Sequence, residues 1–115
     1  MILSLIGFMG SGKSSVAREL AALLCCSYID LDKYIETAER KAIVDIFRDY
    51  GEKTFREMEV KYLKEVLEKS PQDLILSLGG GTVINTGCKE LTIVKTRPVY
   101  LQAEIDTLLR NLENQ

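Results

Sequence analysis

The sequence predicts a single α/β domain in which a parallel β-sheet carries helices on both faces. Short apolar runs typical of buried strands alternate along the chain with stretches whose apolar residues recur at helical spacing. Three of the four predicted strands end in glycine or aspartate, and ligands of such sheets bind beyond the carboxyl ends of the strands. Because 115 residues suffice for one core and not for two, we expect one three-layer domain over residues 1–115.

Each element has its own signal in the sequence. The predicted strands are the short apolar runs at 2–6, 27–31, 73–78 and 98–101. Helical periodicity covers 14–24, 32–38, 42–50 and 52–69, and a last helix is expected from about 103 to 115. Gly51 separates the third helix from the fourth, and Ser70-Pro71 ends the fourth because a residue before proline avoids helical geometry. Residues 82–97 receive no assignment.

Composition excludes several classes of protein. Apolar residues make up 46% and charged residues 28% of the chain, as in an ordinary globular domain. A net charge of −2 offers no basic footprint for nucleic acid or for an anionic membrane. The apolar N-terminus has no basic lead and is predicted to be a strand, not a signal peptide, and no apolar run approaches the ~18 residues of a membrane span.

Cysteine and histidine usage limits the chemistry further. Cys25, Cys26 and Cys88 form neither a disulfide framework nor a zinc-binding spacing, which favours a reducing cytoplasm. Cys25 and Cys26, at the end of a predicted helix, are interpreted as small packing residues. The chain contains no histidine, so the usual general base is missing. Acid–base chemistry must fall to carboxylates, lysines or backbone groups.

The stretch "GFMGSGKSS" at residues 7–15 carries the strongest functional signal. Gly7, Gly12, Lys13 and Ser14 match the phosphate-loop spacing GxxxxGK followed by Ser or Thr. Glycines let backbone N–H groups surround an anion, and the following helix adds the positive end of its dipole. Lys13 can reach the β- and γ-phosphates, and the Ser14 hydroxyl can bind Mg²⁺. We expect ATP with Mg²⁺; the alternative is a tight strand-to-helix turn with a solvated lysine.

Asp30 and Asp32, at the end of the second predicted strand, are the next candidates. Strand alternation would put both carboxylates on one side, aimed at the space above the sheet. One could hold water around the metal while the other takes the proton of an acceptor hydroxyl. The alternative is a turn followed by a helix N-cap, where aspartate is favoured.

Two further features are open to two interpretations each. Arg56 lies one turn from both Glu52 and Glu59, so on its own it predicts a surface ion pair worth a few tenths of a kcal/mol. Three consecutive glycines, 79–81, are costly to order, which indicates a close approach of backbone to another group. The alternative for the glycines is a flexible connector.

Together these segments resemble the shikimate kinase family. The resemblance rests on the loop at 7–15, "DLD" at 30–32, "DIFRDYGEKTFREME" at 45–59, "LSLGGG" at 76–81 and "VYL" at 99–101, in order over nearly the whole chain. It implies a nucleoside monophosphate kinase-like fold with strand order 2-3-1-4. It also implies transfer of the γ-phosphate of ATP to the 3-hydroxyl of shikimate, in the route to chorismate and the aromatic amino acids. Such an enzyme is expected to be cytoplasmic and monomeric when complete, without nucleic-acid or membrane partners.

Matching the motifs assigns residues on the nucleotide side. The resemblance implies that the phosphates of ATP are bound by the loop residues Gly10, Ser11, Gly12, Lys13, Ser14 and Ser15. Lys13 would stabilise the transferred charge, Ser14 would bind Mg²⁺, and Asp30 would support the metal through water. Arg110 lies beside the position of an adenine-stacking arginine in the family, which in our register is Asn111.

The same comparison of motifs assigns the acceptor side. Asp32 would bind the shikimate hydroxyls and act as, or orient, the base. Arg56 would clamp the shikimate carboxylate by a bidentate pair, with Glu59 holding the guanidinium. The remaining contacts would come from the backbone of Gly79, Gly80 and Gly81 and from the rings of Phe47 and Phe55. Lys13 and Asp32 are thus the predicted catalytic residues of a phosphoryl transfer that depends on positioning and electrostatics.

The sequence departs from the family pattern at a few positions. Ser15 replaces a common Thr and Ala17 a common Gly, while Arg40 stands where Gly is frequent, so we expect a different turn before Ile43. Family members continue with a lid arginine, a second substrate arginine, a fifth strand and a final helix, which these 115 residues do not supply. We therefore expect a truncated or incomplete sequence whose full-length form is the active kinase, and an intact mass near 12.9 kDa would indicate a true fragment.

Two other functions remain open at this point. Another small-molecule kinase of the same fold, such as gluconate kinase, would share the phosphate loop but has no need of Arg56 with Glu59 or of the glycine triplet in this form. A nucleotide-binding module without a lid and without catalysis would share the loop as well.

Overall fold

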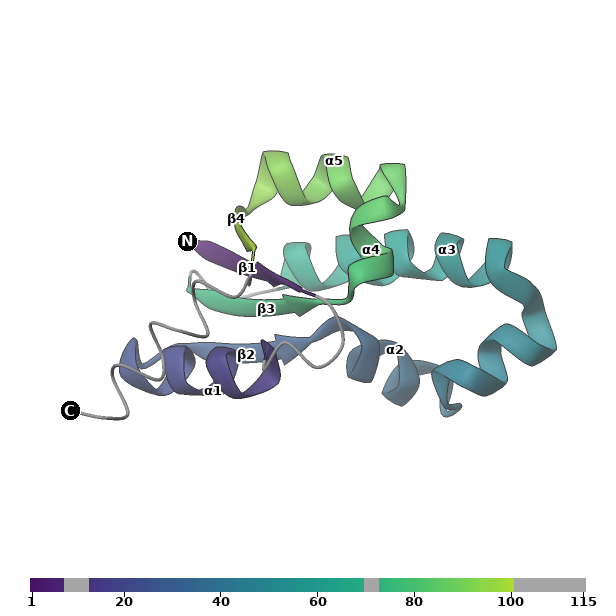
Figure 1. Cartoon of the computed structure of the whole chain (residues 1–115), viewed down its shortest axis with the longest axis horizontal. Coiled ribbons are helices and arrows are strands. Elements are labelled where there is room, and N and C mark those ends of the chain that lie inside the picture. Colours follow the sequence, from purple (N-terminus) through teal and green to yellow (C-terminus); the bar gives the residue numbers. More distant parts are fainter. Residues whose placement is uncertain (8–12, 70–72, 101–115) are drawn as a thin grey trace.

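The computed structural model describes residues 1–7, 13–69 and 73–100 (Figure 1). Its strands are β1 (Ile2–Ile6), β2 (Ser27–Asp30), β3 (Leu74–Leu78) and β4 (Arg97–Tyr100). Its helices are α1 (Lys13–Leu23), α2 (Leu31–Glu39), α3 (Ile43–Lys69), α4 (Gly80–Ile84) and α5 (Thr86–Lys95). The helix predicted from about residue 103 lies outside the described residues.

The four strands form one parallel sheet in the order β2-β3-β1-β4, as predicted. The register aligns Leu5 of β1 with Ser77 of β3, and Ser77 with Asp30 of β2. Because parallel strands share a direction, their carboxyl ends meet at one edge of the sheet, where ligands of such folds bind. Figure 1 shows α2 leaving this edge and α3 bending before it runs back alongside the sheet.

Helices cover both faces of the sheet, so the fold has two apolar cores. The core on the α1 face consists of Leu5, Val16, Ala17, Ala21 and Ile75. The larger core, on the face covered by α2, α3 and α5, consists of Ile6, Leu31, Ile35, Ile46, Phe55, Tyr62, Leu63, Val66, Leu74, Leu76, Leu78 and Cys88. Successive residues of β3 therefore point to opposite cores, which is the alternation expected of a strand buried on both faces.

The region left unassigned from the sequence contains two helices, α4 and α5. Helix α4 begins at Gly80, and glycine is among the weakest helix formers. Ile84, Ile93 and Val94 are exposed large apolar residues, so they obscure the amphipathic pattern that usually reveals a surface helix. The predicted break at Gly51 is confirmed by its non-helical backbone inside α3, with φ 86° and ψ 166°.

Two helix ends place non-glycine residues in the left-handed conformation. After α2, Arg40 has φ 55° and ψ 41°, and Lys41 N donates to Glu36 O at 3.2 Å. After α1, Cys25 has φ 52°, and Cys26 N donates to Ala21 O at 3.0 Å, as in a Schellman motif. The turn at Arg40 thus has the backbone geometry that glycine adopts without strain, although the sequence led us to expect a different turn.

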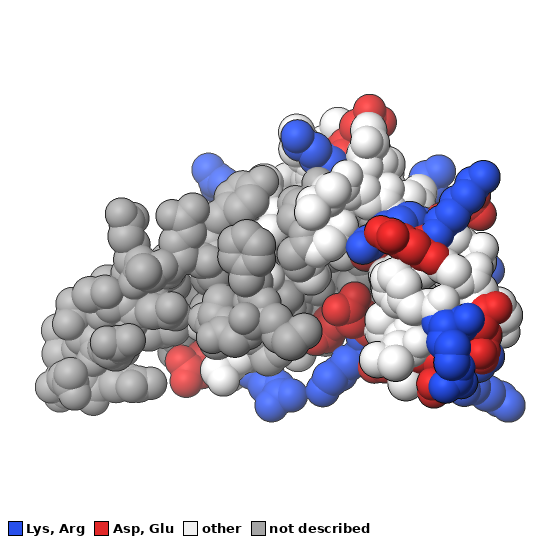
Figure 2. Space-filling model, turned by 45° about the vertical axis from the view of Figure 1, so that its right-hand side comes forward, with Lys and Arg blue, Asp and Glu red and all other residues white. Residues whose placement is uncertain are grey.

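The surface of the described part mixes charges of both signs. In Figure 2, Lys and Arg side chains alternate with Asp and Glu side chains over the coloured part of the view. Across residues 1–7, 13–69 and 73–100, no helix combines the length and the apolar character needed to cross a bilayer.

Candidate active site

The centre of the candidate site is an ion pair within α3. Arg56 Nη1 donates to Glu59 Oε1 at 2.7 Å, and the Glu59 side chain is only 2% exposed. Arg56 Nε also lies 3.8 Å from Oε1 of the exposed Glu52. Both pairings foreseen from the sequence are therefore present, but burial of Glu59 separates its pair with Arg56 from an ordinary surface salt bridge, because a buried charge requires a partner.

Residues from α4 and its C-cap hold this pair in place. The buried Thr82 donates its hydroxyl to Glu59 Oε2 at 2.7 Å. Asn85 Nδ2 lies 2.7 Å from Arg56 O and 3.4 Å from Glu59 Oε1. Sequence reasoning missed Thr82 and Asn85, because both partners are more than 20 residues away; the only local signal is that polar residues closely follow the glycine triplet.

The glycines beyond β3 make room for the predicted acceptor residues. A Cβ at Gly81 would lie 2.9 Å from both terminal nitrogens of Arg56, closer than real Cβ contacts occur. A Cβ at Gly79 would lie 3.2 Å from Asp32 Oδ2. The triplet is neither a free turn nor a flexible connector: Gly79 is the N-cap of α4, and Gly80 and Gly81 form its first turn. The structure thus brings Asp32 and Arg56 beside the same short segment.

Our expectation that Asp30 and Asp32 share one side of a strand is wrong. Strand β2 ends at Asp30, and Leu31 already begins α2, so Asp32 lies in the first turn of that helix. Asp30 is the N-cap, and its side chain accepts a hydrogen bond from Lys33 N at 3.3 Å. The N-cap alternative is therefore right for Asp30. The helix, and not strand alternation, brings Asp32 to Gly79.

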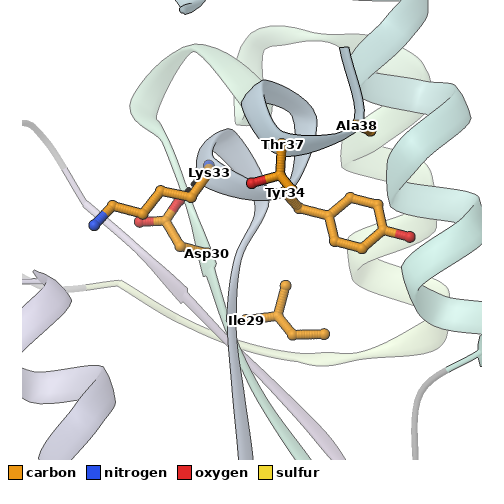
Figure 3. A pocket seen from close by; sticks show the side chains of 6 residues that line it. All are labelled: Ile29, Asp30, Lys33, Tyr34, Thr37 and Ala38. Atoms are coloured by element: carbon orange, nitrogen blue, oxygen red, sulfur yellow. Dashed lines mark hydrogen bonds between the residues drawn. The ribbon is translucent and has the colours of Figure 1, made fainter. Parts of the chain in front are cut away.

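Asp30 also borders a pocket on the outer side of β2 and α2. Figure 3 shows Asp30 and Lys33 together at one end of this pocket and the Tyr34 ring directed the other way. The complete lining is Ile29, Asp30, Lys33, Tyr34, Thr37 and Ala38. With a single carboxylate, the cationic Lys33 and otherwise aliphatic or neutral groups, this pocket is no metal cage. One oxygen of the Asp30 carboxylate already accepts the capping hydrogen bond from Lys33 N.

Phe47 and Phe55 flank the guanidinium of Arg56. Their ring centres are 4.6 Å apart, and Arg56 Cζ lies 5.4 Å from the centre of Phe55 and 5.9 Å from that of Phe47. These distances fall within the range of cation–π attraction. Phe55 is 3% exposed and belongs to the large core, whereas Phe47 is half-buried. The two rings therefore restrict where Arg56 can move.

Behind the ion pair, Cys88 of α5 is fully buried. Burial, followed by the charge of Glu59, raises the pKa of the Cys88 thiol to about 12, against a weaker opposing effect of Arg56. The thiol therefore stays protonated at neutral pH and adds no second negative charge behind Glu59.

The described residues include only part of the predicted nucleotide side. Gly10, Ser11, Gly12 and Arg110 lie outside the described residues. Lys13 and Ser14 form the first positions of α1, and Ser15 follows as an exposed residue of the same helix. Within the described ranges, no group of three or more His, Cys, Asp and Glu residues is placed to hold a metal ion.

The order β2-β3-β1-β4, the helix that closely follows β1 and the fixed arginine beside a glycine-rich strand end define an α/β kinase fold of the phosphate-loop class. The family model for shikimate kinase matches residues 9–115. The chain belongs to the shikimate kinase family.

Individual relatives agree with this assignment. The chain is 38% identical to the shikimate kinase of Dictyoglomus turgidum, over 98% of its own length and 65% of that protein. It is 43% identical to the shikimate kinase of Thermus thermophilus, over 92% of its own length and 56% of that protein. Shikimate kinase from Bacteroides thetaiotaomicron superimposes with a TM-score of 0.83 at 33% identity, covering 89% of this chain and 57% of that one. Shikimate kinase from Acinetobacter baumannii in complex with shikimate superimposes with a TM-score of 0.81 at 35% identity. This match covers 87% of the present chain and 55% of that one. The chain thus spans less than two thirds of each of these relatives.

Proposed function

We propose that this chain belongs to an enzyme that phosphorylates the 3-hydroxyl of shikimate, with ATP as the phosphate donor. The observation that carries the proposal is Arg56, whose orientation is fixed by the buried Glu59 and which lies against Gly81. A guanidinium held in this way offers a planar fork that fits a carboxylate. The relatives reported above are shikimate kinases, and shikimate carries such a carboxylate.

On the acceptor side, Arg56 would bind the carboxylate of shikimate and Asp32 its hydroxyls. Asp32 lies beside the N-cap of α4, so a substrate bound there would also accept hydrogen bonds from the backbone N–H groups of Gly79, Gly80 and Gly81. Asp32 would accept or orient the proton of the attacking hydroxyl. Phe55 and Phe47, which contact Arg56, would border the ring of the substrate.

On the donor side, the loop from Gly10 to Ser15 would hold the phosphates of ATP, with Lys13 neutralising the transferred charge. Mg²⁺ brought in by a nucleotide needs only one or two protein ligands, which suits a region with one carboxylate, Asp30, and the Ser14 hydroxyl. When bound, the ion would neutralise charge on the phosphate oxygens. Contact of Arg110 with adenine and a cytoplasmic location remain parts of this proposal.

Binding experiments on single-arginine variants test the acceptor site. Arg56→Ala should weaken shikimate binding by on the order of 100-fold, because a charge-paired bidentate contact is lost, and should leave ATP binding intact. Arg56→Lys keeps the positive charge but lacks the planar fork of the guanidinium, so its shikimate affinity should lie between those of wild type and Arg56→Ala. Isothermal titration with shikimate and with ATP measures both. Arg48→Ala is the matched control, since Arg48 lies on the same helix but pairs with Asp45 and Asp49 at the surface.

A panel of acceptors in a coupled ADP-release assay separates shikimate from other substrates of this fold. Turnover of gluconate without turnover of shikimate would contradict the proposal. Unchanged shikimate affinity in Arg56→Ala, with the variant folded as judged by thermal unfolding, would show that the acceptor site lies elsewhere.

A further inference from the structure

The first segment of α3, residues 43–50, begins without a capping side chain of its own. Ala42 precedes this segment and has no side-chain oxygen, although the first N–H groups of a helix have no partner within the helix. Glu36, in the last turn of α2, supplies the missing acceptor, because its Oε2 receives the Ile43 N–H at 2.9 Å. A carboxylate from the preceding helix thus caps the start of α3, where negative charge is favoured.

The later segment of α3, residues 52–69, holds the same turn of α2. The buried Tyr62 donates its hydroxyl to Glu39 Oε2, and its ring meets that of Tyr34 edge-on, with the ring centres 6.0 Å apart. The hydrogen bond to Glu39, followed by burial, raises the pKa of Tyr62 to about 12, so the phenol keeps its proton at neutral pH. The last turn of α2 is therefore joined to both segments of α3.

Gly51 separates these two segments. Its backbone, with φ 86° and ψ 166°, is not helical, so residues 52–69 do not fix the direction of residues 43–50 as one continuous helix would. Figure 1 shows the resulting bend of α3. The direction of the first segment therefore depends on its tertiary contacts, among them the cap from Glu36 at its start and the burial of Ile46 along its length.

Phe47 connects this segment to the candidate acceptor site. Its ring centre lies 4.6 Å from that of Phe55 and 5.9 Å from Arg56 Cζ, and both of these partners belong to the later segment. Phe47 follows Ile43 by four residues, about one helical turn, so a shift of the capped end displaces the ring. The cap on Ile43 thus acts on the side of the site that Phe47 forms.

We propose that Glu36 is a positioning residue of the acceptor site, which caps Ile43 from α2 and thereby holds the Phe47 ring against Arg56. The inference rests on the proposed function, in which Phe47 borders the substrate ring and Arg56 binds its carboxylate. Glu36 acts through the backbone of Ile43 and not on the substrate. A cap that served folding alone would stabilise the protein without a specific effect on shikimate.

A double-mutant cycle between Glu36 and Phe47, measured by titration with shikimate, tests the inference. Glu36→Ala should weaken shikimate binding by about three- to tenfold, because the Phe47 ring is displaced, and should leave ATP affinity unchanged. In a Phe47→Ala background the same change should have little further effect, since the residue through which Glu36 acts is absent. Glu36→Gln keeps a side-chain oxygen acceptor and should retain most of the wild-type affinity.

A local cap separates positioning from stability. Ala42→Asp, added to Glu36→Ala, supplies a favoured capping side chain directly before Ile43 and keeps the net charge. It should restore the urea unfolding midpoint, because the helix end is capped again. Shikimate affinity should stay low, because the connection to α2 is still missing. Recovery of both stability and shikimate affinity would show that only the cap matters and would overturn the inference.

Asp49→Asn is the matched control, since Asp49 is a carboxylate of the same segment that pairs with Lys41 and Arg48 at the surface. It should bind shikimate like wild type, because exposed ion pairs contribute little. Equal losses from Glu36→Ala in the wild-type and Phe47→Ala backgrounds, or equal losses for ATP and shikimate, overturn the inference and leave the proposed function standing. Wild type that binds ATP but not shikimate overturns the proposed function, and the inference with it.

Discussion

At the scale of the residue, the candidate acceptor site depends on the environment of Glu59. A carboxylate that is almost fully buried is costly unless each oxygen has a partner, and here Arg56 and Thr82 take one oxygen each. Glu59 is thereby fixed, and it fixes Arg56 in turn. The position of Arg56 thus depends on Thr82, which comes 23 residues after Glu59 in the sequence.

Thr82→Val tests this dependence with a nearly unchanged side-chain shape. The variant leaves one oxygen of Glu59 without its donor, so we expect a loss of about 1–3 kcal/mol in the free energy of unfolding and weaker shikimate binding. Urea denaturation and titration with shikimate measure the two effects. Thr92→Val is the control, because Thr92 is similarly buried and its hydroxyl donates to Cys88 O within α5, away from Glu59. Equal shikimate affinity in both variants would contradict the role given to Thr82.

Gly81→Ala probes the space that Arg56 occupies. The added Cβ would lie 2.9 Å from the guanidinium, so the arginine must shift, and we expect shikimate affinity to fall by about tenfold or more, because small displacements of positioning groups are costly. Alanine favours helix over glycine by about 1 kcal/mol, so α4 itself should not be weakened. Titration with shikimate measures the loss of affinity, and thermal unfolding shows whether the variant stays folded. Wild-type affinity in a folded variant would contradict this geometry.

At the scale of the element, hydrophobic periodicity sufficed for the strands and for α1 to α3, because these segments bury apolar residues at regular spacing. It failed for α4 and α5, where glycines open one helix and exposed Ile93 and Val94 blur the face of the other. It also extended β2 by one residue, so Asp32 was expected on the side of a strand, whereas it lies in the first turn of α2. Arg56 and Glu59 could be singled out from their spacing, but Thr82 and Asn85 act through tertiary contacts that leave no local pattern.

The end of α2 offers a test of strain in one helix cap. Arg40 adopts φ 55°, a conformation that costs a side chain with a Cβ about 1–2 kcal/mol and costs glycine little. We expect Arg40→Gly to raise the free energy of unfolding by about 0.5–1 kcal/mol, since the greater freedom of glycine in the unfolded chain offsets part of the gain. Arg40→Ala keeps the Cβ and should bring no such gain. A urea midpoint for Arg40→Gly below that of Arg40→Ala would contradict this account.

At the scale of the whole molecule, buried protonated groups predict loss of stability in alkali. Burial and Glu59 raise the pKa of Cys88 to about 12, and a hydrogen bond to Glu39, followed by burial, raises the pKa of Tyr62 to about 12. In an unfolded chain the thiol and the phenol titrate near about 8.5 and about 10. The native state therefore holds both protons more tightly. The stability from these groups is complete below the unfolded pKa values and is lost as the pH rises towards 12.

Urea denaturation at several values between about pH 8 and about pH 11 measures this loss. We expect the free energy of unfolding of wild type to fall with pH, with Cys88 contributing a slope of up to about 1.4 kcal/mol per pH unit. Cys88→Ala removes that contribution, so its stability should start lower, because of the cavity, and decline less steeply. Parallel curves for the two proteins would contradict the raised pKa of Cys88.

The two cores on opposite faces of the sheet have a consequence for redesign. Asp30 and Ser77 project from the face under α1, whereas Arg56, Glu59 and Thr82 belong to helices on the other side of β3. If the proposed function holds, a protein engineer could therefore change the preference for the acceptor alcohol by varying side chains of α3 and α4, while the residues facing α1 stay untouched. Strand β3 would then separate two groups of side chains, one on each face of the sheet, and each group could be varied without changing the other.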